Sequence, residues 1–338
     1  MTELIEQPEQ DTKAKPVMFD FGEPESVIGN ALDELGSYED DSQGYYEPPI
    51  EKEGIAKLLL ANGTHESMAN LKTNMIARFY KPNKFISFET FFKMAMDWNV
   101  FGEYYVQNVF NRFGKLIECR HLPAVPMRVA TNKNRFVKVL PNGKLIKFKQ
   151  GEVSHCKRYN IHNSQYGSPE YLGAFQSILL GEDSILFKRR YYKNGAHMGF
   201  ILFSQDPDLS PEVEEDLRQK LKQSKGVGNF NSMFVNIPNS TAKEPLKLIP
   251  VGEVGSSDDL ETAQRVSKEN VLGAWRIPEA LSSSRSGNGN TGDIIKAVKA
   301  YTELEIIPMF PHLQQINLFL PEAARIEFNI PKTSIFEE

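Results

Sequence analysis

Cysteine is scarce in this sequence, with Cys119 and Cys156 the only two among 338 residues. So low a number excludes a disulfide scaffold and is typical of a reducing compartment. Long apolar runs are also missing. The longest, residues 58–61 and 200–203, have four residues each, whereas a transmembrane helix needs roughly 20. The first ten residues are acidic and polar, unlike a secretory signal. We therefore expect a cytosolic protein that does not contact a membrane.

Motifs that carry catalysis are missing as well. The loop SGNGNTGD over 286–293 has the glycines of a phosphate cradle, but it lacks the Lys-Ser/Thr pair that follows them in a P-loop. His155, Cys156 and His162 lack the partner pair that zinc spacing requires. No serine has the G-x-S-x-G surroundings of a hydrolase, and no spaced carboxylate set fits a two-metal nuclease. The sequence predicts no enzyme, no metal site and no cofactor.

The charge is distributed unevenly along the chain. Residues 1–54 hold fifteen acids and three bases, a balance of −12, whereas residues 55–338 hold 29 acids and 36 bases, a balance of +7. The acidic opening predicts a solvated, partly ordered arm. The mildly basic remainder would tolerate nucleic acid nearby, but it is far from the basic patch of a sequence-specific reader.

The length predicts roughly two domains, and the first part of the chain mixes helices with strands. Apolar spacing favours two short helices over 55–80 and another over 88–99, which Ser87 caps. Residues 103–110, 116–122, 127–129, 136–140 and 145–148 alternate or carry β-branched and aromatic side chains. Pro141 to Gly143 is a hairpin signal between the last two of these strands.

Two long helices are predicted further along the chain. Ser168 is expected to cap the first, which Pro169 and Glu170 open and Asn194-Gly195 ends. At about 1.5 Å per residue it would be a rod of about 39 Å. The second begins at Ser257 and ends before Pro278. Between them lie a strand over 197–204, a helix capped at Ser210 and a strand over 232–237, which together predict a small α/β module.

Residues 282–293 form the least helical stretch of the C-terminal half. Four serines, three glycines and two asparagines among twelve residues predict a mobile loop. Asp293 is expected to cap a last helix, which Pro308 kinks or stops. A strand over 325–330 would close the chain.

Two basic clusters can each be interpreted in two ways. One consists of Lys188, Arg189, Arg190 and Lys193, and the other of Lys220, Lys222 and Lys225. The first cluster is most simply a helix C-terminus whose cations complement the helix dipole. A contact with nucleic acid or a partner is the alternative for both.

The sequence resembles a known protein family. Residues 165–202, QYGSPEYLGAFQSILLGEDSILFKRRYYKNGAHMGFIL, are similar to the signature of phage portal proteins of the contractile-tail, PBSX type. Further segments agree in order and spacing: FDFGEP (19–24), YYEPPI (45–50), FGEYYV (101–106), KGVGNFNSMFV (225–235), KLIPVGEV (247–254), RIPEAL (276–281) and residues 292–308. The resemblance covers nearly the whole chain.

The resemblance implies an α+β portal fold with wing, long stem helices, a small α/β clip and a tunnel loop. It implies these parts: an acidic, partly ordered arm (1–54), wing (55–167), stem helix (168–195), clip (196–252), stem helix (253–277), tunnel loop (278–293) and a crown-side wing segment (294–338).

The family's function is also implied. About twelve copies would form a ring at one capsid vertex of the virion, assembled in the host bacterial cytoplasm. Double-stranded DNA would pass through its channel without sequence-specific contacts. The expected partners are further copies of the chain, the terminase large subunit, the major capsid and scaffold proteins, and neck or head-completion proteins.

Two sets of site residues follow from this resemblance, and the basic cluster near the end of the first stem helix forms a third. The tunnel loop would place Ser282, Ser283, Ser284, Arg285, Ser286, Gly287, Asn288, Gly289, Asn290, Thr291 and Gly292 in the channel. The clip would present Glu214, Glu215, Arg218 and Lys222 to partners. The stem would carry Lys188, Arg189, Arg190 and Lys193.

Two other classes stay open on sequence alone. A nucleic-acid-processing enzyme would need a carboxylate or histidine cluster, and a monomeric adaptor would not form a ring.

Overall fold

The computed structural model describes residues 39–40, 44–132, 135–193, 200–204, 233–236, 246–250, 257–282 and 291–330. Three helices open the body: α2 (Lys52–Ala61), α3 (Gly63–Ala77) and α4 (Phe88–Phe101). The Ser87 side chain accepts a hydrogen bond from Thr90 N at 3.1 Å, which confirms the predicted cap of α4. Phe88, the first residue of α4, is 50% exposed and does not belong to the buried face of the helix.

Strands follow the helices in the predicted order. The strands β4 (Glu103–Phe110) and β5 (Leu116–Leu122) pair antiparallel and have the predicted bounds. A strand missed in the sequence, β9 (Val153–Lys157), pairs with the other edge of β4. A second antiparallel sheet has the order β1-β2-β6-β7-β8, with these members: β1 (Glu39–Asp40), β2 (Tyr45–Tyr46), β6 (Met127–Ala130), β7 (Phe136–Val139) and β8 (Leu145–Lys147).

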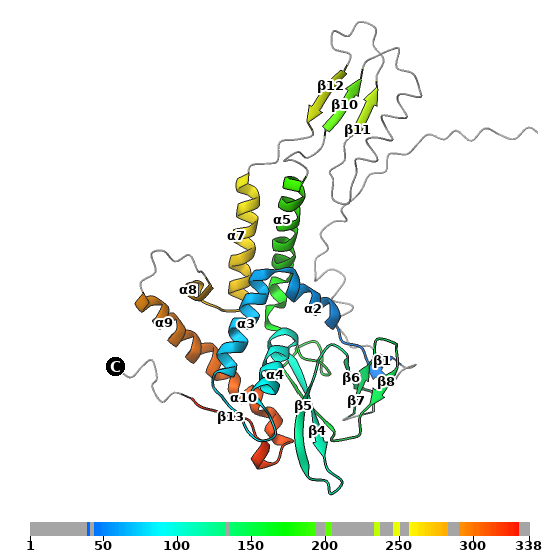
Figure 1. The fold of residues 1–338 in the computed structure, drawn as a ribbon, viewed down its shortest axis with the longest axis vertical. Coiled ribbons are helices and arrows are strands. Elements are labelled where there is room, and N and C mark those ends of the chain that lie inside the picture. Colours follow the sequence, from blue (N-terminus) through cyan, green and yellow to red (C-terminus); the bar gives the residue numbers. More distant parts are fainter. Residues whose placement is uncertain are drawn as a thin grey trace, which may run out of the picture.

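Two helices stand side by side out of the body (Figure 1). They are α5 (Phe175–Lys193) and α7 (Ser257–Ala274), and they run in opposite directions. The first is shorter than predicted, because residues Glu170–Ala174 form the 3₁₀-helix η1 instead of α-helix. Pro169, not Ser168, precedes that turn. At about 1.5 Å per residue, α5 measures about 28 Å rather than 39 Å.

Three strands are described between α5 and α7 in the sequence. β10 (Phe200–Ser204) pairs in parallel with β11 (Met233–Asn236), and antiparallel with β12 (Leu246–Pro250), which the sequence reading missed. Parallel neighbours need a crossover connection. The predicted helix of that connection lies outside the described residues.

The C-terminal end of α7 is a Schellman motif. Ile277 N bonds Leu272 O at 3.1 Å and Arg276 N bonds Gly273 O at 3.0 Å, the paired bonds that define this ending. Arg276 has a φ of 54° at the position that glycine usually occupies. The side chains of Leu272 and Ile277 both enter the core, so the end of α7 is firmly anchored.

The predicted loop over 282–293 is shorter in the structure. Ser282 ends the short helix α8 (Glu279–Ser282), and α9 (Thr291–Tyr301) begins two residues before Asp293, which is therefore not its cap. Residues 283–290 lie outside the described part. The α-helix also ends seven residues before Pro308. The chain continues in these turns: the π-helix η2 (Thr302–Ile306), the 3₁₀-helix η3 (Ile307–Met309), α10 (Phe310–Leu313), and the 3₁₀-helices η4 (Gln314–Leu318) and η5 (Glu322–Ala324).

One hydrophobic core joins these parts. It contains α4 and β4 from the first half together with the end of α7, α10 and η4 from the second. The final strand, β13 (Glu327–Phe328), pairs with β3 (Tyr80–Lys81), and the Phe328 ring stacks on Phe310 at 4.0 Å. Among the described helices, none combines the length and apolar character needed to cross a membrane.

Candidate functional site: the pair of α5 and α7 and its base

The pair α5 and α7 approaches closely along one line of small residues. Ser267 Oγ donates to Ser177 O at 2.5 Å, and Asn270 Nδ2 bonds Ser177 Oγ at 3.0 Å. At Gly181 a methyl group would lie 2.5 Å from Ser267 Oγ and 2.6 Å from Asn62 Nδ2. Since real Cβ atoms do not approach so closely, glycine is required for this spacing of the helices. The two helices therefore form a fixed pair rather than two independent rods.

The base of the pair holds a buried aromatic cluster. Trp275 and Tyr171 stack with their ring centroids 5.0 Å apart, and Trp275 Nε1 donates to His65 Nδ1 at 3.0 Å. Burial lowers the pKa of His65 to about 4, so the ring is neutral near pH 7 and its Nδ1 accepts. Trp275 and Tyr171 are both fully buried. The cluster thus locks the end of α7 to η1 and α3.

A buried lysine beside this cluster joins three segments. Lys72 of α3 is fully buried, and its ammonium contacts Glu170 of η1 and lies 2.9 Å from Glu305 of η2. Arg158 bonds Glu170 at 2.9 Å, and Arg276 bonds Glu305 at 3.3 Å. Each carboxylate is therefore paired with two cations, which offsets the desolvation cost of burying it.

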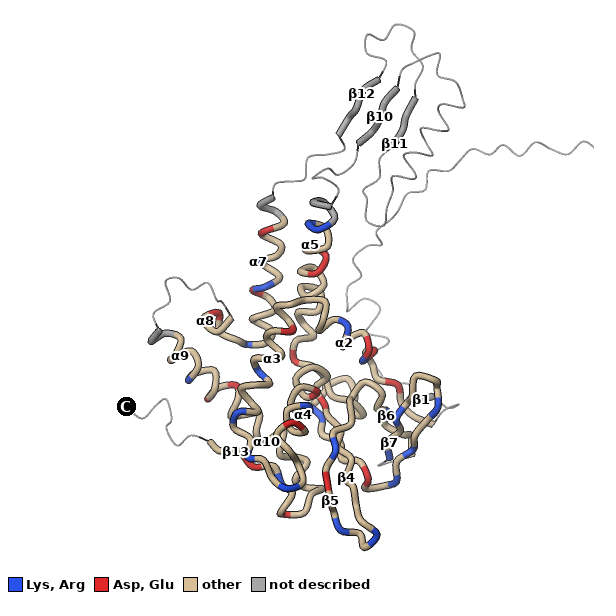
Figure 2. The backbone as a smooth tube through the Cα atoms, viewed as in Figure 1, with Lys and Arg blue, Asp and Glu red and all other residues tan. Residues whose placement is uncertain are grey.

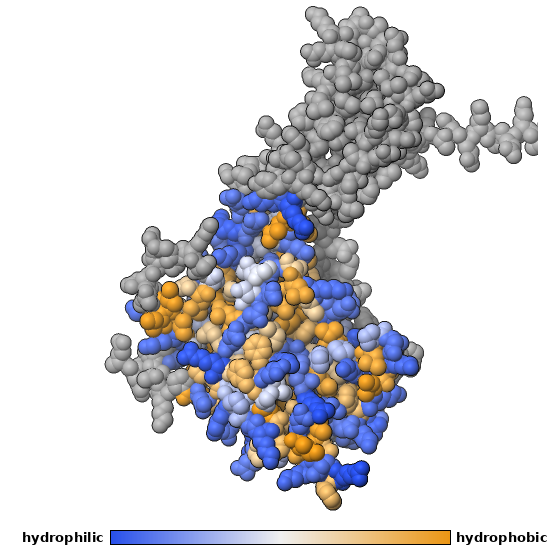
Figure 3. Space-filling view, in the orientation of Figure 1, coloured by the Kyte–Doolittle hydropathy of each residue, from blue (hydrophilic) through white to orange (hydrophobic). Residues whose placement is uncertain are grey.

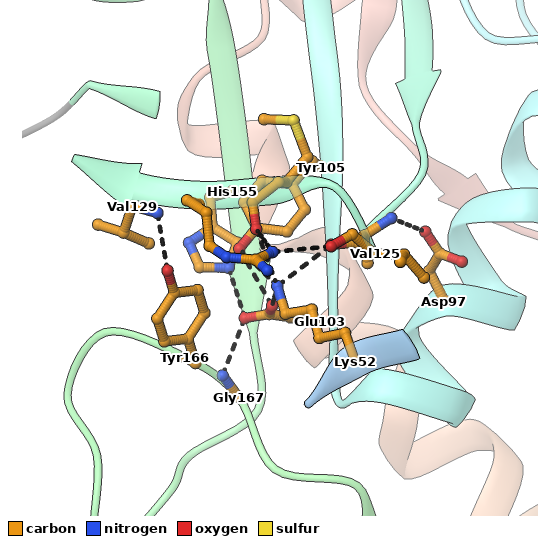
Figure 4. A network of polar contacts seen from close by, with 12 residues as sticks. Lys52, Asp97, Glu103, Tyr105, Val125, Val129, His155, Tyr166 and Gly167 are labelled. Atoms are coloured by element: carbon orange, nitrogen blue, oxygen red, sulfur yellow. Dashed lines mark hydrogen bonds and ion pairs between the residues drawn. The ribbon is translucent and has the colours of Figure 1, made fainter. Parts of the chain in front are cut away.

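A second buried network lies around Glu103, the first residue of β4 (Figure 4). Lys52 Nζ lies 2.5 Å from Glu103 Oε1, and His155 Nε2 lies 2.9 Å from Oε2. Tyr105 OH donates to the same carboxylate at 3.0 Å, and Gly167 N donates at 2.9 Å. Burial alone would raise the pKa of Glu103, but the charge of Lys52 and these hydrogen bonds hold that pKa well below its usual value.

The contacts of Glu103 hold segments of the fold together. Burial lowers the pKa of His155 despite the attraction of Glu103, so the ring donates a hydrogen bond as a neutral group. The Lys52 ammonium also bonds the carbonyls of Ala124 and Met127, at 3.2 and 3.3 Å. The network ties α2, β4, β9, the segment from Ala124 to Met127 and the turn at Gly167 together.

The residues that the sequence suggested as metal ligands, His155, Cys156 and His162, do not form a metal site. His155 bonds Glu103, whereas Cys156 Sγ lies 3.8 Å from His312 O. Burial raises the pKa of the Cys156 thiol to about 11, which keeps it protonated. Across the described ranges, no group of three or more His, Cys, Asp or Glu side chains is placed to hold a metal ion.

The predicted site residues are divided between described and undescribed parts of the chain. Lys188, Arg189, Arg190 and Lys193 lie in the last turns of α5, as predicted. Ser282 ends α8, whereas Thr291 and Gly292 begin α9. The other loop positions, 283–290, and the clip residues Glu214, Glu215, Arg218 and Lys222 lie outside the described residues.

Charge of both signs is scattered over the body and along α5 and α7 (Figure 2), and apolar surface gathers around α9 (Figure 3). Ile295 of α9 is 53% exposed. The sequence reading missed both buried networks. A signal was available at Glu103, since an acid at the start of a strand with several large apolar residues requires a cationic partner if it is buried.

Comparison with known proteins agrees with this architecture. The model of the phage portal protein family matches residues 53–333. The probable portal protein of Haemophilus phage HP1 is 35% identical over 297 residues, which cover 86% of this chain and 85% of that protein. The probable portal protein of Escherichia phage P2 is 34% identical over 304 residues, covering 89% of this chain and 88% of that protein.

Solved structures share the fold. A chain from the neck of a native gene transfer agent particle matches with a TM-score of 0.59 at 15% identity, covering 91% of both chains. An HK97-family phage portal protein from Corynebacterium diphtheriae matches with a TM-score of 0.55 at 14% identity, covering 81% of this chain and 94% of that one. The PBSX-type subfamily stays a prediction. The match over nearly the whole chain and the identity to two phage proteins show that the chain belongs to the phage portal protein family.

Proposed function

We propose that this protein forms a ring of about twelve copies at one vertex of a phage capsid and passes double-stranded DNA through it. The observation that carries the proposal is the antiparallel pair α5 and α7, fixed to each other at Gly181 and locked into the body at Trp275. Such a pair is suited to form the wall of a channel. The neck of the similar gene transfer agent particle was computed with C12 symmetry, which supports the number.

The dimensions of such a ring fit DNA. Twelve stem helices roughly 10 Å apart give a circumference of about 120 Å, hence about 38 Å between opposite axes. Subtracting about 10 Å for the width of a helix leaves a bore of about 28 Å. A duplex roughly 20 Å wide passes through it. DNA must also slide through the ring, and each phosphate that a protein neutralises strengthens its salt-dependent binding to DNA. A channel through which DNA slides therefore needs few such contacts.

Mass in solution tests the ring. Size-exclusion chromatography with light scattering should find a species near twelve times 38.4 kDa. A monomer that cleaves DNA would instead support a nucleic-acid-processing enzyme. An inactive monomer that neither assembles into rings in the presence of capsid and scaffold proteins nor enters particles would support the monomeric adaptor.

The domain assignment is part of the proposal. Residues 168–195 and 253–277 act as the stem, 196–252 as the clip, and 55–167 with 294–338 as the wing. The acidic residues 1–54 precede the wing, although α2 begins at Lys52, so this boundary falls inside a helix.

Partners dock on the clip in this proposal: first the terminase large subunit, then neck or head-completion proteins. The major capsid and scaffold proteins surround the ring at the virion vertex after assembly in the host bacterial cytoplasm. The chain itself supplies no catalysis, and a partner ATPase supplies the motive force. Charge reversal at Glu215 and Lys222 should leave rings intact but weaken terminase pull-down. Unchanged pull-down would show that this module only seals neighbouring subunits together.

The tunnel loop is assigned to residues 278–293, with Arg285 as its single cation. Replacing Gly287, Gly289 and Gly292 by alanine should impair DNA packaging or retention while rings still form, because alanine narrows the backbone freedom that glycine gives. A ring structure that placed Arg285 on the outer rim, away from the axis, would contradict the assignment.

A further inference from the structure

A wide groove that the channel proposal does not use opens on the body beside the base of the stem. Its volume is about 1040 Å³. One wall is the loop over 157–164, and the other is the irregular helical segment over 304–315. Glu170 and Arg276 line its floor.

The rim of this groove, called here the 157–164 groove, is apolar and exposed. Tyr159 is 83% exposed, Ile161 79% and Leu304 72%. A cluster of large, exposed apolar side chains around one concavity is a mark of an interaction site.

The lining of the groove carries a small positive excess. Two lining carboxylates, Glu170 and Glu305, pair with two lining cations, Arg158 and Arg276. Lys157 in the wall adds a third cation. Arg276 is 67% exposed and bonds Glu305 through one terminal nitrogen, whereas a guanidinium has five N–H donors. The groove therefore suits a segment that is apolar and acidic at once.

We propose that residues 17–25 of this chain occupy the 157–164 groove. Their sequence, VMFDFGEPE, has four large apolar side chains, three carboxylates and no base. Apolar side chains would cover the rim, and the carboxylates would meet Arg276 and its neighbours. The thirteen residues between this segment and Glu39 span up to about 45 Å when extended, so the segment can lie well away from β1, on its own copy or on an adjacent one. Docking in this groove does not require a ring, so it stands or falls separately from the channel.

Cysteine cross-linking in the full-length protein tests the docking. Phe19→Cys combined with Ile161→Cys should cross-link roughly tenfold more than Phe19→Cys combined with Phe113→Cys, because docking raises the effective concentration of the first thiol pair. Phe113 is a matched control, since it is 94% exposed at the tip of the β4–β5 hairpin. The native cysteines, Cys119 and Cys156, are buried. Mixing two tagged versions of the chain shows which copy supplies the segment.

Removal of one charge distinguishes docking in the groove from nonspecific association. Arg276→Gln should reduce the cross-link to Ile161→Cys several-fold, whereas Arg265→Gln should not. Arg265 is equally suitable for removal, because its side chain is 64% exposed and pairs with Glu269 on α7. Equal cross-linking at positions 161 and 113 would overturn the proposal. So would cross-linking of Ile335→Cys, but not Phe19→Cys, at position 161, because it would assign the groove to residues 331–338.

Discussion

Two glycines in the stem helices should respond to alanine with opposite signs. Gly181 lies in α5, where a methyl group would meet Ser267 Oγ at 2.5 Å and Asn62 Nδ2 at 2.6 Å. Gly273 lies in α7, and a methyl group there meets nothing within 4 Å. Alanine gains about 1 kcal/mol in helix propensity at either position. The two sites therefore differ only in what surrounds the added methyl group.

The expected free-energy changes can be estimated from the contacts. At Gly181 the methyl group forces α5 from α7 at a cost of about 1–3 kcal/mol. It also displaces two hydrogen bonds, Ser267 Oγ to Ser177 O and Asn62 Nδ2 to Ile178 O, which contribute about 1 kcal/mol each. After the propensity gain, Gly181→Ala should destabilise the fold by about 2–4 kcal/mol. Gly273→Ala should stabilise it by about 0.5–1 kcal/mol.

Urea unfolding followed by circular dichroism, at one protein concentration, measures both changes. Adding Ser267→Ala to Gly181→Ala removes the nearest obstructing atom, so the double variant should recover part of the lost free energy of unfolding. If Gly181→Ala and Gly273→Ala agreed within about 0.5 kcal/mol, the close contact of α5 and α7 would be refuted, since surface substitutions fall in that range.

Three further predictions concern the body. Glu103→Leu alone should cost about 3–5 kcal/mol, because it leaves the Lys52 charge unpaired in the core, whereas the double variant with Lys52→Met should cost clearly less. A double variant that cost the sum of the two single variants would exclude coupling between Glu103 and Lys52. The folded-state pKa values of Glu103 and His155 lie below their ordinary values of 4.5 and 6.5. The unfolded state therefore binds more protons in acid, and stability should fall as the pH drops below 6.5 and more steeply below 4.5. The slope below 4.5 should flatten in Glu103→Gln, and an unchanged slope would assign it to other carboxyls. Ser87→Ala should lower the free energy of unfolding by about 1 kcal/mol, because the cap of α4 is lost, whereas Ser87→Asp should keep most of that stability, because aspartate also caps helices. Equal unfolding midpoints for the two variants would contradict the cap.

Local signals in the sequence predicted the elements that local chemistry determines. The Ser87 cap, the bounds of β4 and β5, and the turn at Gly143, with a φ of 75°, all follow from residues within a few positions. The start of α7 at Ser257 was predicted in the same way. In each case the deciding interaction lies inside the segment itself.

The misses come from interactions between distant segments. The polar residues Ser154 and His155 hide β9 in the sequence, yet both are largely buried because β4 supplies Asn108 and Glu103 as partners. The 3₁₀ turn at Glu170–Ala174 likewise depends on tertiary contacts, since Lys72 holds Glu170 and Val100 O accepts from Tyr171 OH. A reading of one segment at a time does not see a partner about 50 or 100 residues away, as here.

The same distant contacts determine how the stem is connected to the rest of the molecule. Three segments are joined around Lys72: η1 contacts it through Glu170 and η2 through Glu305, and Arg276 at the end of α7 bonds the same Glu305. The left-handed backbone of Arg276 costs roughly 1 kcal/mol relative to glycine, but only a side chain there reaches Glu305. Because Lys72 is fully buried between two carboxylates, shifting η1 or η2 alone would leave a charge unpaired in the core, which is strongly unfavourable. A load on the pair of α5 and α7 is therefore transmitted to η1 and η2 together, so the proposed channel wall and the segment that follows α9 should move as one body.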